Sequence, residues 1–387
     1  MRLGPIAAWT CILAAALAGC LPEADDQGEP SSTPNVVIIF LDDVGYGDLG
    51  TFGHPTIRTP NMDRLAGQGV KLTGFYAASP SCSPSRAALL TGRYPVRAGI
   101  HWALGPEEEN GISAEEWTLA EALHEAGYAT AAIGKWHLGA RPEFFPTEHG
   151  FDSYFGLLYS NDMMKPWVQT DRPLELYRDT RPIEHPVDQA TLTRRYTEEA
   201  VRFIEESAAR DRPFFLYLAH SMAHVPLYRS PEFEGHSAGG KYGDVIEELD
   251  WSVGTVRQAL KGAGVLNNTL VFLMSDNGPW AEMPDRMFAD GHIQPWDAGT
   301  SGPLRGSKAS VWEGGLRVPA VVWGPGFLVG DHSVSGLATV MDVFPTIAAL
   351  VGLDAAPGRP FDGHDLMPWL EGGPDSPNEL FFYVYPD

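Results

Sequence analysis

The chain has 387 residues, of which 44% are hydrophobic and 20% charged, so it is long and apolar enough to bury one large core or two smaller ones. Asp and Glu (50) outnumber Lys and Arg (27), and the formal net charge of -23 argues against a nucleic-acid partner. The three cysteines, Cys11, Cys20 and Cys82, are too few for a disulfide framework.

The N-terminal residues have the composition of a targeting segment followed by a tether. An arginine precedes an apolar run over 6–18, which is shorter than the roughly 20 residues of a membrane span. The run ends in LAGC at Cys20, which resembles a bacterial lipobox; the alternative is a plain secretory peptide. We expect a lipoprotein-type signal peptide over 1–20 and a flexible tether over 21–34. The protein would then be exported to the bacterial periplasm or cell envelope and held at a membrane by a lipid on Cys20.

From residue 35 onward, short apolar runs alternate with helical patterns, which predicts a mainly parallel sheet covered by helices. The run over 36–41 is apolar throughout, as expected of a strand buried on both faces. Further strands are predicted at 128–133, 214–218, 270–274 and 318–323. Helices are predicted at 60–68 with Thr59 as its cap, just after Cys82, at 118–126 with a capping box of Thr118 and Glu121, and at 191–208, 245–260 and 342–350.

The segment that begins at Cys82 has the pattern of a helix start with a reactive residue directly in front of it. Ser83 is a good N-cap, and Pro84 suits the first helical position. Cys82 is therefore predicted at a helix N-terminus, where free N–H groups and the dipole favour an anion. Arg86 adds a permanent cation in the first turn. The alternative is an ordinary buried cysteine before a helix.

Polar residues follow four of the predicted strands. They are Asp42 and Asp43, Lys135 and His137, His220 and His224, and Asp276 and Asn277. Ligands of open α/β sheets bind outside the carboxyl ends of strands, so these residues are expected to converge; the alternative at any single end is turn chemistry. The acidic and amide side chains among them are all oxygen donors, which suit Ca²⁺ or Mg²⁺ rather than zinc.

The sequence CSPSRAALLTGR over 82–93 resembles the signature of the sulfatase family, which begins C-x-P-S-R and ends in G-R. The resemblance extends over 35–387. In that family the cysteine is oxidised after translation to formylglycine, an aldehyde whose hydrate attacks the sulfate ester. The resemblance therefore implies that Cys82 becomes the nucleophile after modification by a formylglycine-generating enzyme.

Two further segments resemble the metal ligands of the family. Sulfatases carry a D-D pair after the first strand and a D-N-G segment after a later one, and both are present here. In the family these residues bind one divalent metal, usually Ca²⁺, which also contacts the formylglycine and a sulfate oxygen. The implied ligands, with Mg²⁺ as the alternative ion, are Asp42, Asp43, Cys82, Asp276 and Asn277.

The remaining motifs resemble catalytic and substrate-binding segments of the family. The sequence GKWHLG contributes Lys135 and His137, AHVP contributes His224, and Lys308 precedes WEGG at the distance seen in the family. Ser160, within YSND, resembles a substrate-contacting serine of the arylsulfatase A group.

The resemblance also implies how these residues share the reaction. The positive charges of Arg86, Lys135 and Lys308 would neutralise the sulfate oxygens. His224 or Lys308 would protonate the leaving oxygen, and His137 would help to expel sulfate from the modified residue. The implied substrate contacts come from Ser160, Lys135, His224 and Lys308.

The fold implied is an alkaline-phosphatase-like α/β sandwich, with a large, mainly parallel central sheet flanked by helices, over a catalytic domain at 35–387. The family normally continues past a segment like 381–386 into a small antiparallel sheet, so this C-terminal subdomain is expected to be missing. The expected activity is hydrolysis of sulfate monoesters, either aryl sulfates or sulfated carbohydrates. Two alternatives stay open: a phosphonate or phosphate ester hydrolase of the same superfamily, and an inactive surface lipoprotein that binds sulfated glycans.

Overall fold

The computed structural model describes residues 1, 4, 33–354 and 359–383. Cys20 and nearly all of the predicted signal peptide and tether lie outside the described residues. Within the described ranges, no helix is both long enough and apolar enough to cross a membrane.

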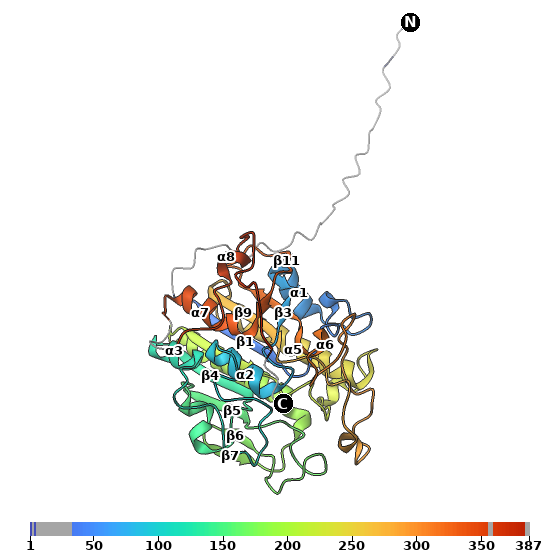
Figure 1. Ribbon diagram of the computed structural model, residues 1–387. Coiled ribbons are helices and arrows are strands. Elements are labelled where there is room, and N and C mark those ends of the chain that lie inside the picture. Colours follow the sequence, from blue (N-terminus) through green and yellow to red (C-terminus); the bar gives the residue numbers. More distant parts are fainter. Residues whose placement is uncertain (2–3, 5–32, 355–358, 384–387) are drawn as a thin grey trace.

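A sheet of ten strands forms the middle of the molecule (Figure 1). From one edge to the other its strands are β11 (His332–Val334), β2 (Val70–Leu72), β10 (Ala320–Trp323), β9 (Thr269–Ser275), β1 (Asn35–Leu41), β8 (Phe214–Ala219), β4 (Ala129–Lys135), β5 (Ser153–Leu157), β6 (Leu176–Arg178) and β7 (Arg181–Glu184). A separate pair is formed by β3 (Phe75–Tyr76) and β12 (Ala338–Thr339).

The centre of the sheet is parallel. Strands β9, β1, β8 and β4 are neighbours that run in one direction, whereas β10 and the β6–β7 hairpin add antiparallel strands towards the two edges. Every residue of β1 is buried, as predicted for a strand covered on both faces. Because parallel strands end at the same edge, the segments that follow these four strands are brought together there.

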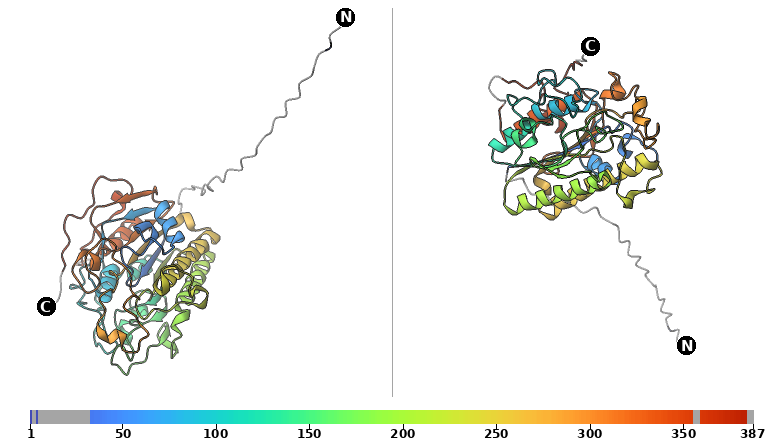
Figure 2. Two further views of the ribbon diagram at one scale, coloured as in Figure 1. Left: turned by 90° about the vertical axis from the view of Figure 1, so that its right-hand side faces the viewer. Right: turned by 90° about the horizontal axis from the view of Figure 1, so that it is seen from below.

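Helices cover both faces of the sheet (Figure 2). One layer consists of α1 (Pro60–Gln68), α4 (Leu192–Ala209) and α5 (Gly240–Gly262). The other consists of α2 (Cys82–Thr91), α3 (Leu119–Glu125) and α7 (Val343–Val351). Two one-turn helices, α6 (Glu313–Leu316) and α8 (Met367–Leu370), lie in the C-terminal part of the chain. The predicted helix-covered, mainly parallel sheet is confirmed.

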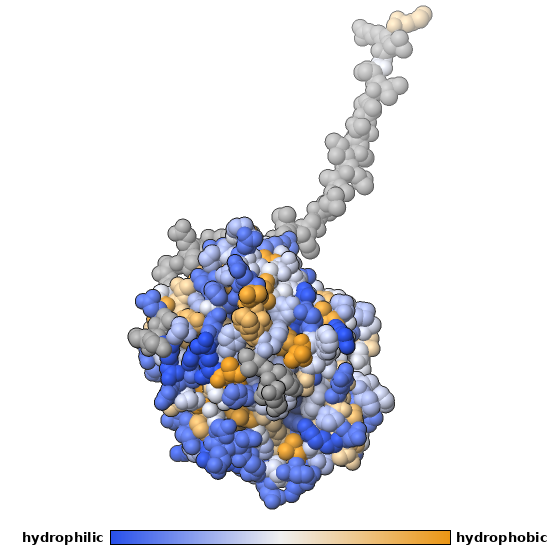
Figure 3. All heavy atoms as spheres, in the orientation of Figure 1, coloured by the Kyte–Doolittle hydropathy of each residue, from blue (hydrophilic) through white to orange (hydrophobic). Residues whose placement is uncertain are grey.

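The apolar side chains follow this layering. Residues of the strands and of the sheet-facing sides of the helices form one continuous buried core. The face of the molecule in Figure 3 is mostly hydrophilic, with hydrophobic residues in small groups.

The helix boundaries confirm several predictions and correct one. The capping box of α3 is present: Thr118 Oγ1 accepts from the N–H of Glu121, and the Glu121 carboxylate accepts from the N–H of Thr118. The predicted N-cap Ser83 is wrong, because α2 begins at Cys82 and Ser81 is the residue with an extended backbone before it. Any first-turn position suits Pro84, whose missing N–H has no helical partner there, so the proline did not fix the start.

Candidate active site

The carboxyl ends of the central strands meet the N-terminus of α2. Asp42 and Asp43 follow β1, and Asp276 follows β9. Cys82 is the first residue of α2, and its Sγ lies 3.6 Å from Asp42 Oδ1 and 3.3 Å from Lys308 Nζ. Four segments far apart in the sequence therefore face one small volume at the edge of the sheet.

Three buried carboxylates surround the Cys82 sulfur. One ligand atom from each residue of this group lies within 4.8 Å of all the others, the group being Asp42, Asp43, Cys82 and Asp276. Asn277 Nδ2 donates to Asp43 Oδ1 at 2.7 Å, whereas Asn277 Oδ1 is buried and has no hydrogen-bond partner. An oxygen-rich cluster with one amide oxygen left unpaired fits a hard divalent cation such as Ca²⁺ or Mg²⁺.

Each carboxylate of the cluster is paired with a cation, and Asp42 is paired with two, because Arg86 Nη2 also lies 3.5 Å from Asp42 Oδ1. Arg86 Nη2 lies 2.7 Å from Asp276 Oδ2, and its Nη1 donates to the backbone carbonyl of Lys135 at 2.8 Å. Lys135 Nζ lies 2.6 Å from Asp42 Oδ2. Lys308 Nζ lies 2.6 Å from Asp43 Oδ1. Charges removed from water are costly unless paired, and the pairing explains how this cluster is tolerated inside the protein.

The protonation of the cluster follows from burial and from these neighbours. Burial raises the pKa of Asp42 to about 7, although Lys135 opposes the effect. Burial alone would also raise the pKa of Asp276, but Arg86 and the two lysines bring it below its usual value. Burial raises the pKa of the Cys82 thiol, so the unmodified cysteine is held as a thiol and is a poor nucleophile.

The predicted histidines His137 and His224 both lie at this site. They differ in which ring nitrogen is left to accept a hydrogen bond. His137 Nε2 is 2.9 Å from the carbonyl oxygen of Leu104, and His224 Nδ1 is 2.6 Å from the carbonyl oxygen of Val225. A carbonyl only accepts, so these nitrogens carry the protons, and His137 Nδ1 and His224 Nε2 carry the lone pairs. Burial, followed by the neighbouring lysines, lowers the pKa of both rings. Both are therefore neutral and can accept a proton or a hydrogen bond.

A cavity of about 150 Å³ opens over this cluster. Its lining consists of Pro80, Ser81, Cys82, Trp102, Ala103, His137, Ser160, Asp162, Met163, His224, Trp280, Arg286, Lys308 and Ala309. Ser160 Oγ accepts from Lys135 Nζ at 3.2 Å, so the predicted substrate-contacting serine also lies here. All the residues singled out for catalysis, substrate contact and metal binding thus lie at or directly behind this cavity.

Sequence reasoning missed part of the lining. Asp162 stands two residues after Ser160, and Trp280 stands three residues after Asn277, so both adjoin segments that had been singled out. Trp102 and Arg286 lie in segments with no motif, and only the fold brings them to the cavity. His220, by contrast, is buried against Ser252 Oγ of α5 at 3.1 Å and does not line the cavity.

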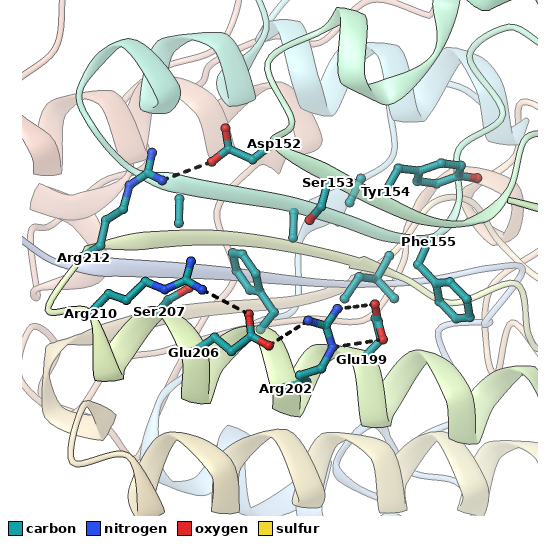
Figure 4. Close-up of a pocket in the computed structure, with 15 residues that line it drawn as sticks. Asp152, Ser153, Tyr154, Phe155, Glu199, Arg202, Glu206, Ser207, Arg210 and Arg212 are labelled. Atoms are coloured by element: carbon teal, nitrogen blue, oxygen red, sulfur yellow. Dashed lines mark hydrogen bonds and ion pairs between the residues drawn. The ribbon is translucent and has the colours of Figure 1, made fainter. Parts of the chain in front are cut away.

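A second cavity, of about 290 Å³, lies between α4 and the strands β4 and β5 (Figure 4). Charged side chains line its rim and pair with one another: Arg212 with Asp152, Arg210 and Arg202 with Glu206, and Arg202 with Glu199. None of the predicted site residues lies here. Cys82 and the buried carboxylate cluster lie at the smaller cavity and not at this one.

Comparison with known proteins identifies the family of the chain. The Sulfatase family model matches residues 34–353. N-acetylgalactosamine-6-sulfatase of Mus musculus is 40% identical over 368 residues, covering 90% of this chain and 68% of that protein. Arylsulfatase A of Bos taurus is 40% identical over 401 residues, covering 98% of this chain and 75% of that protein.

A solved structure shares the fold of this chain. The crystal structure of Ps i-CgsB in complex with k-i-k-neocarrahexaose superimposes with a TM-score of 0.76 at 31% identity, covering 87% of this chain and 76% of that chain. The chain belongs to the sulfatase family, and its relatives are sulfate ester hydrolases. Members of this family generally use a formylglycine and a divalent cation, and the buried cluster around Cys82 fits such a metal site.

Proposed function

We propose that the protein hydrolyses sulfate monoesters of sugars or aryl alcohols, with a formylglycine made from Cys82 as its nucleophile and one divalent cation, Ca²⁺ in the first place, beside it. The observation that carries the proposal is the position of Cys82. Its sulfur lies in a carboxylate cluster, 3.3 Å from Lys308 Nζ, at the floor of a cavity of about 150 Å³.

The charge balance of the cluster supports a bound cation. Asp42, Asp43 and Asp276 carry three negative charges when ionised, and Arg86, Lys135 and Lys308 carry three positive charges, so the pairs cancel. With all three carboxylates ionised, the cluster has no net positive charge to attract a sulfate ester. The carboxylates and the unpaired Asn277 Oδ1 would hold the ion, which supplies the positive charge that the site otherwise lacks.

Formylglycine at position 82 supplies a hydrated aldehyde, a nucleophile that can be restored after each turnover. The N-terminus of α2 and the side chains of Lys135 and Lys308 are placed to stabilise negative charge at that position. His137 lines the cavity and carries a lone pair on Nδ1, so it can take the proton of the second hydroxyl of the hydrate as sulfate is expelled and the aldehyde is restored. No other described side chain bonds to it, so it is available for that role.

The leaving oxygen needs a proton donor, and Lys308 suits this role better than His224. His224 donates its Nδ1 proton to a backbone carbonyl and holds a lone pair on Nε2, so the neutral ring has no proton to give towards the cavity. Lys308 carries three N–H donors and contacts the sulfur of Cys82. We assign proton donation to Lys308 and hydrogen-bond acceptance to His224.

Of the phosphonate or phosphate ester hydrolase alternatives, a zinc phosphatase is the less well supported, whereas a phosphonate hydrolase is distinguished by turnover assays. Zinc phosphatases need nitrogen ligands, but the cluster around Asp43 offers oxygens, with His224 Nε2 as the only histidine nitrogen in contact at 3.6 Å among the described residues. The alternative of an inactive glycan-binding protein gives no reason for the buried ion pairs beneath the cavity.

Export and membrane anchoring through Cys20 are proposed on the sequence alone. The test is fractionation of cells that express the full chain. Wild type is expected in the membrane fraction and the Cys20→Ala variant in the soluble fraction, and a wild-type N-terminus other than Cys20 would refute the anchor.

The proposed activity is tested with protein co-expressed with a formylglycine-generating enzyme. The tryptic peptide that contains Cys82 should lose mass relative to cysteine and react with a hydrazide. The matured protein should hydrolyse 4-methylumbelliferyl sulfate faster than 4-methylumbelliferyl phosphate, and Cys82→Ala should abolish turnover. An active preparation with only the thiol, or faster turnover of the phosphate, would contradict the proposal.

A further inference from the structure

The outer wall of the cavity contains a carboxylate that the proposed reaction does not use. Asp162 lines the cavity and is 3% exposed. Its Oδ1 is buried without a hydrogen-bond partner, and its Oδ2 lies 3.9 Å from Arg286 Nη1. A buried acceptor without a partner is costly, so a bound donor from outside the protein is the natural partner for this oxygen.

An acidic group is out of place in a pocket for an anion. Burial raises the pKa of Asp162, but Lys308 and Lys135, which face the reactive position, act against it. The carboxylate is thus close enough to interact electrostatically with the same lysines that would hold the sulfate. It repels any negative charge placed beside it. Asp162 is therefore suited to bind a part of the substrate that is neutral and donates hydrogen bonds.

Aromatic rings line the same cavity as this carboxylate. The Trp280 ring packs against His224, with 5.3 Å between ring centroids, and both Lys308 and Arg286 lie over it. Trp102, which is 42% exposed, lines the same cavity. Flat apolar walls with a few fixed polar groups are typical of small-molecule sites, and here they would receive the group from which sulfate is removed.

We infer that Asp162 selects the alcohol half of the substrate by accepting a hydrogen bond from a free hydroxyl on the sugar ring that carries the sulfate. The inference rests on the proposed function and narrows it. The substrate class is a monosulfated sugar with an unmodified hydroxyl near the ester. A second sulfate or a carboxylate at that hydroxyl is rejected by the charge of Asp162.

The first test uses matured wild-type protein and needs no variant. The substrates are galactose 6-sulfate, N-acetylgalactosamine 6-sulfate, their monodeoxy analogues and 4-methylumbelliferyl sulfate. At least one monodeoxy analogue should lose about tenfold or more in kcat/KM, because the site discriminates strongly against an analogue that leaves a buried polar group unpaired. Equal kcat/KM values for all the deoxy analogues and their parents would overturn the inference.

The second test uses the Asp162→Asn and Asp162→Ala variants. Asp162→Ala removes the acceptor and should lower the ratio of kcat/KM for the sugar sulfate to that for 4-methylumbelliferyl sulfate by about tenfold or more, whereas Asp162→Asn keeps an amide oxygen as acceptor and should lower it less. The penalty of the sensitive deoxy analogue should largely vanish in Asp162→Ala, because the hydroxyl and the carboxylate are partners and their losses are not additive. The matched control is Asp171→Asn, the same change at a carboxylate that is 96% exposed, which should keep the ratio.

The outcomes separate the two proposals. If the variants hydrolyse the aryl sulfate but their ratio is that of wild type, Asp162 does not select the sugar, whereas the sulfatase activity stands. Turnover of the aryl sulfate by a variant also shows that the variant is folded. If matured wild type hydrolyses neither the sugar sulfates nor the aryl sulfate, the proposed function fails and this inference fails with it.

Discussion

Two clusters of charged side chains in this protein contain arginines beside carboxylates, and they differ in contact with water. Beneath the Cys82 cavity, the side chains of Arg86 and Asp276 are both 0% exposed. Along the rim of the α4 cavity, Arg202 is 50% exposed and Glu206 45% exposed (Figure 4). The α4 cavity is the larger of the two, at about 290 Å³ against about 150 Å³.

The difference shows that burial, rather than cavity size or charge count, marks the reactive site. At the α4 rim, water screens each ion pair, and such pairs contribute about 0–1 kcal/mol. Beneath Cys82, the same kinds of groups lie in a low-dielectric interior, where each charge strongly affects its neighbours and would act on a developing charge. Four predictions test this contrast, from the largest expected effect to the smallest.

The largest effect is expected from Arg86→Met. The substitution leaves the Asp276 carboxylate buried without its main partner, and removal of one member of a buried pair typically costs about 3–5 kcal/mol. The free energy of unfolding should be measured by urea denaturation in the presence of a chelator, with Arg202→Ala as the control. A loss for Arg86→Met no greater than that of the control would show that the two clusters are equivalent.

Lys308→Ala should mainly reduce turnover. Loss of one preorganised group that stabilises charge lowers kcat by about 10²–10³, which corresponds to about 2.7–4 kcal/mol. Steady-state kinetics of matured protein on 4-methylumbelliferyl sulfate measures the effect. The α4-rim variant Arg202→Ala should keep its kcat, and a comparable loss there would mean that the rim contributes to catalysis.

Calcium should stabilise the protein through the Cys82 cluster only. A ligand present at about 100 times its Kd adds about 2.7 kcal/mol to the stability of the folded state. Thermal unfolding with Ca²⁺ and with a chelator should show the shift in wild type and in Glu206→Gln, but not in Asp43→Asn. A shift that remains in Asp43→Asn would mean that Ca²⁺ binds elsewhere. A larger shift with Zn²⁺ than with Ca²⁺ would mean that the site prefers a different ion.

The smallest effect is expected at the α4 rim. A double-mutant cycle of Arg202→Ala and Glu206→Ala should give a coupling energy of about 0.3–0.5 kcal/mol, because the pair is an exposed i,i+4 pair on one helix. High salt should reduce this coupling further. A coupling energy as large as that of a buried pair would contradict the distinction between the two regions.

The sequence predicted the centre of the fold better than its edges. The run over 36–41 is apolar throughout, and it forms the fully buried strand β1, which pairs with β8 and β9 in the sheet. Strands β6 and β7 at the sheet edge were not predicted. Their sequences, LYR and RPIE, have neither an apolar run nor a clean alternation, and their pairing depends on the β5 edge rather than on local pattern.

The candidate site shows the same division. Cys82, Lys135 and Asp276 stand in motifs or at strand ends, and parallel strands bring such ends together without further information. Arg286 lies in a short 3-10 helix (Asp285–Phe288) after β9 and reaches the cavity only through the tertiary structure. No sequence pattern predicts that an isolated arginine will line a cavity. The part of the cavity wall that contains Arg286 could therefore not be predicted.

The spacing of the contacts around Asp43 has a consequence for the time course of refolding. Asp43 contacts Asp276, 233 residues away, and Lys308, 265 residues away. Contacts of such long range form slowly, because the chain must close very large loops before they stabilise it. Secondary structure measured by circular dichroism should therefore recover well before enzymatic activity when matured protein is diluted from denaturant. Recovery of activity is then a specific probe for the docking of β9 against β1.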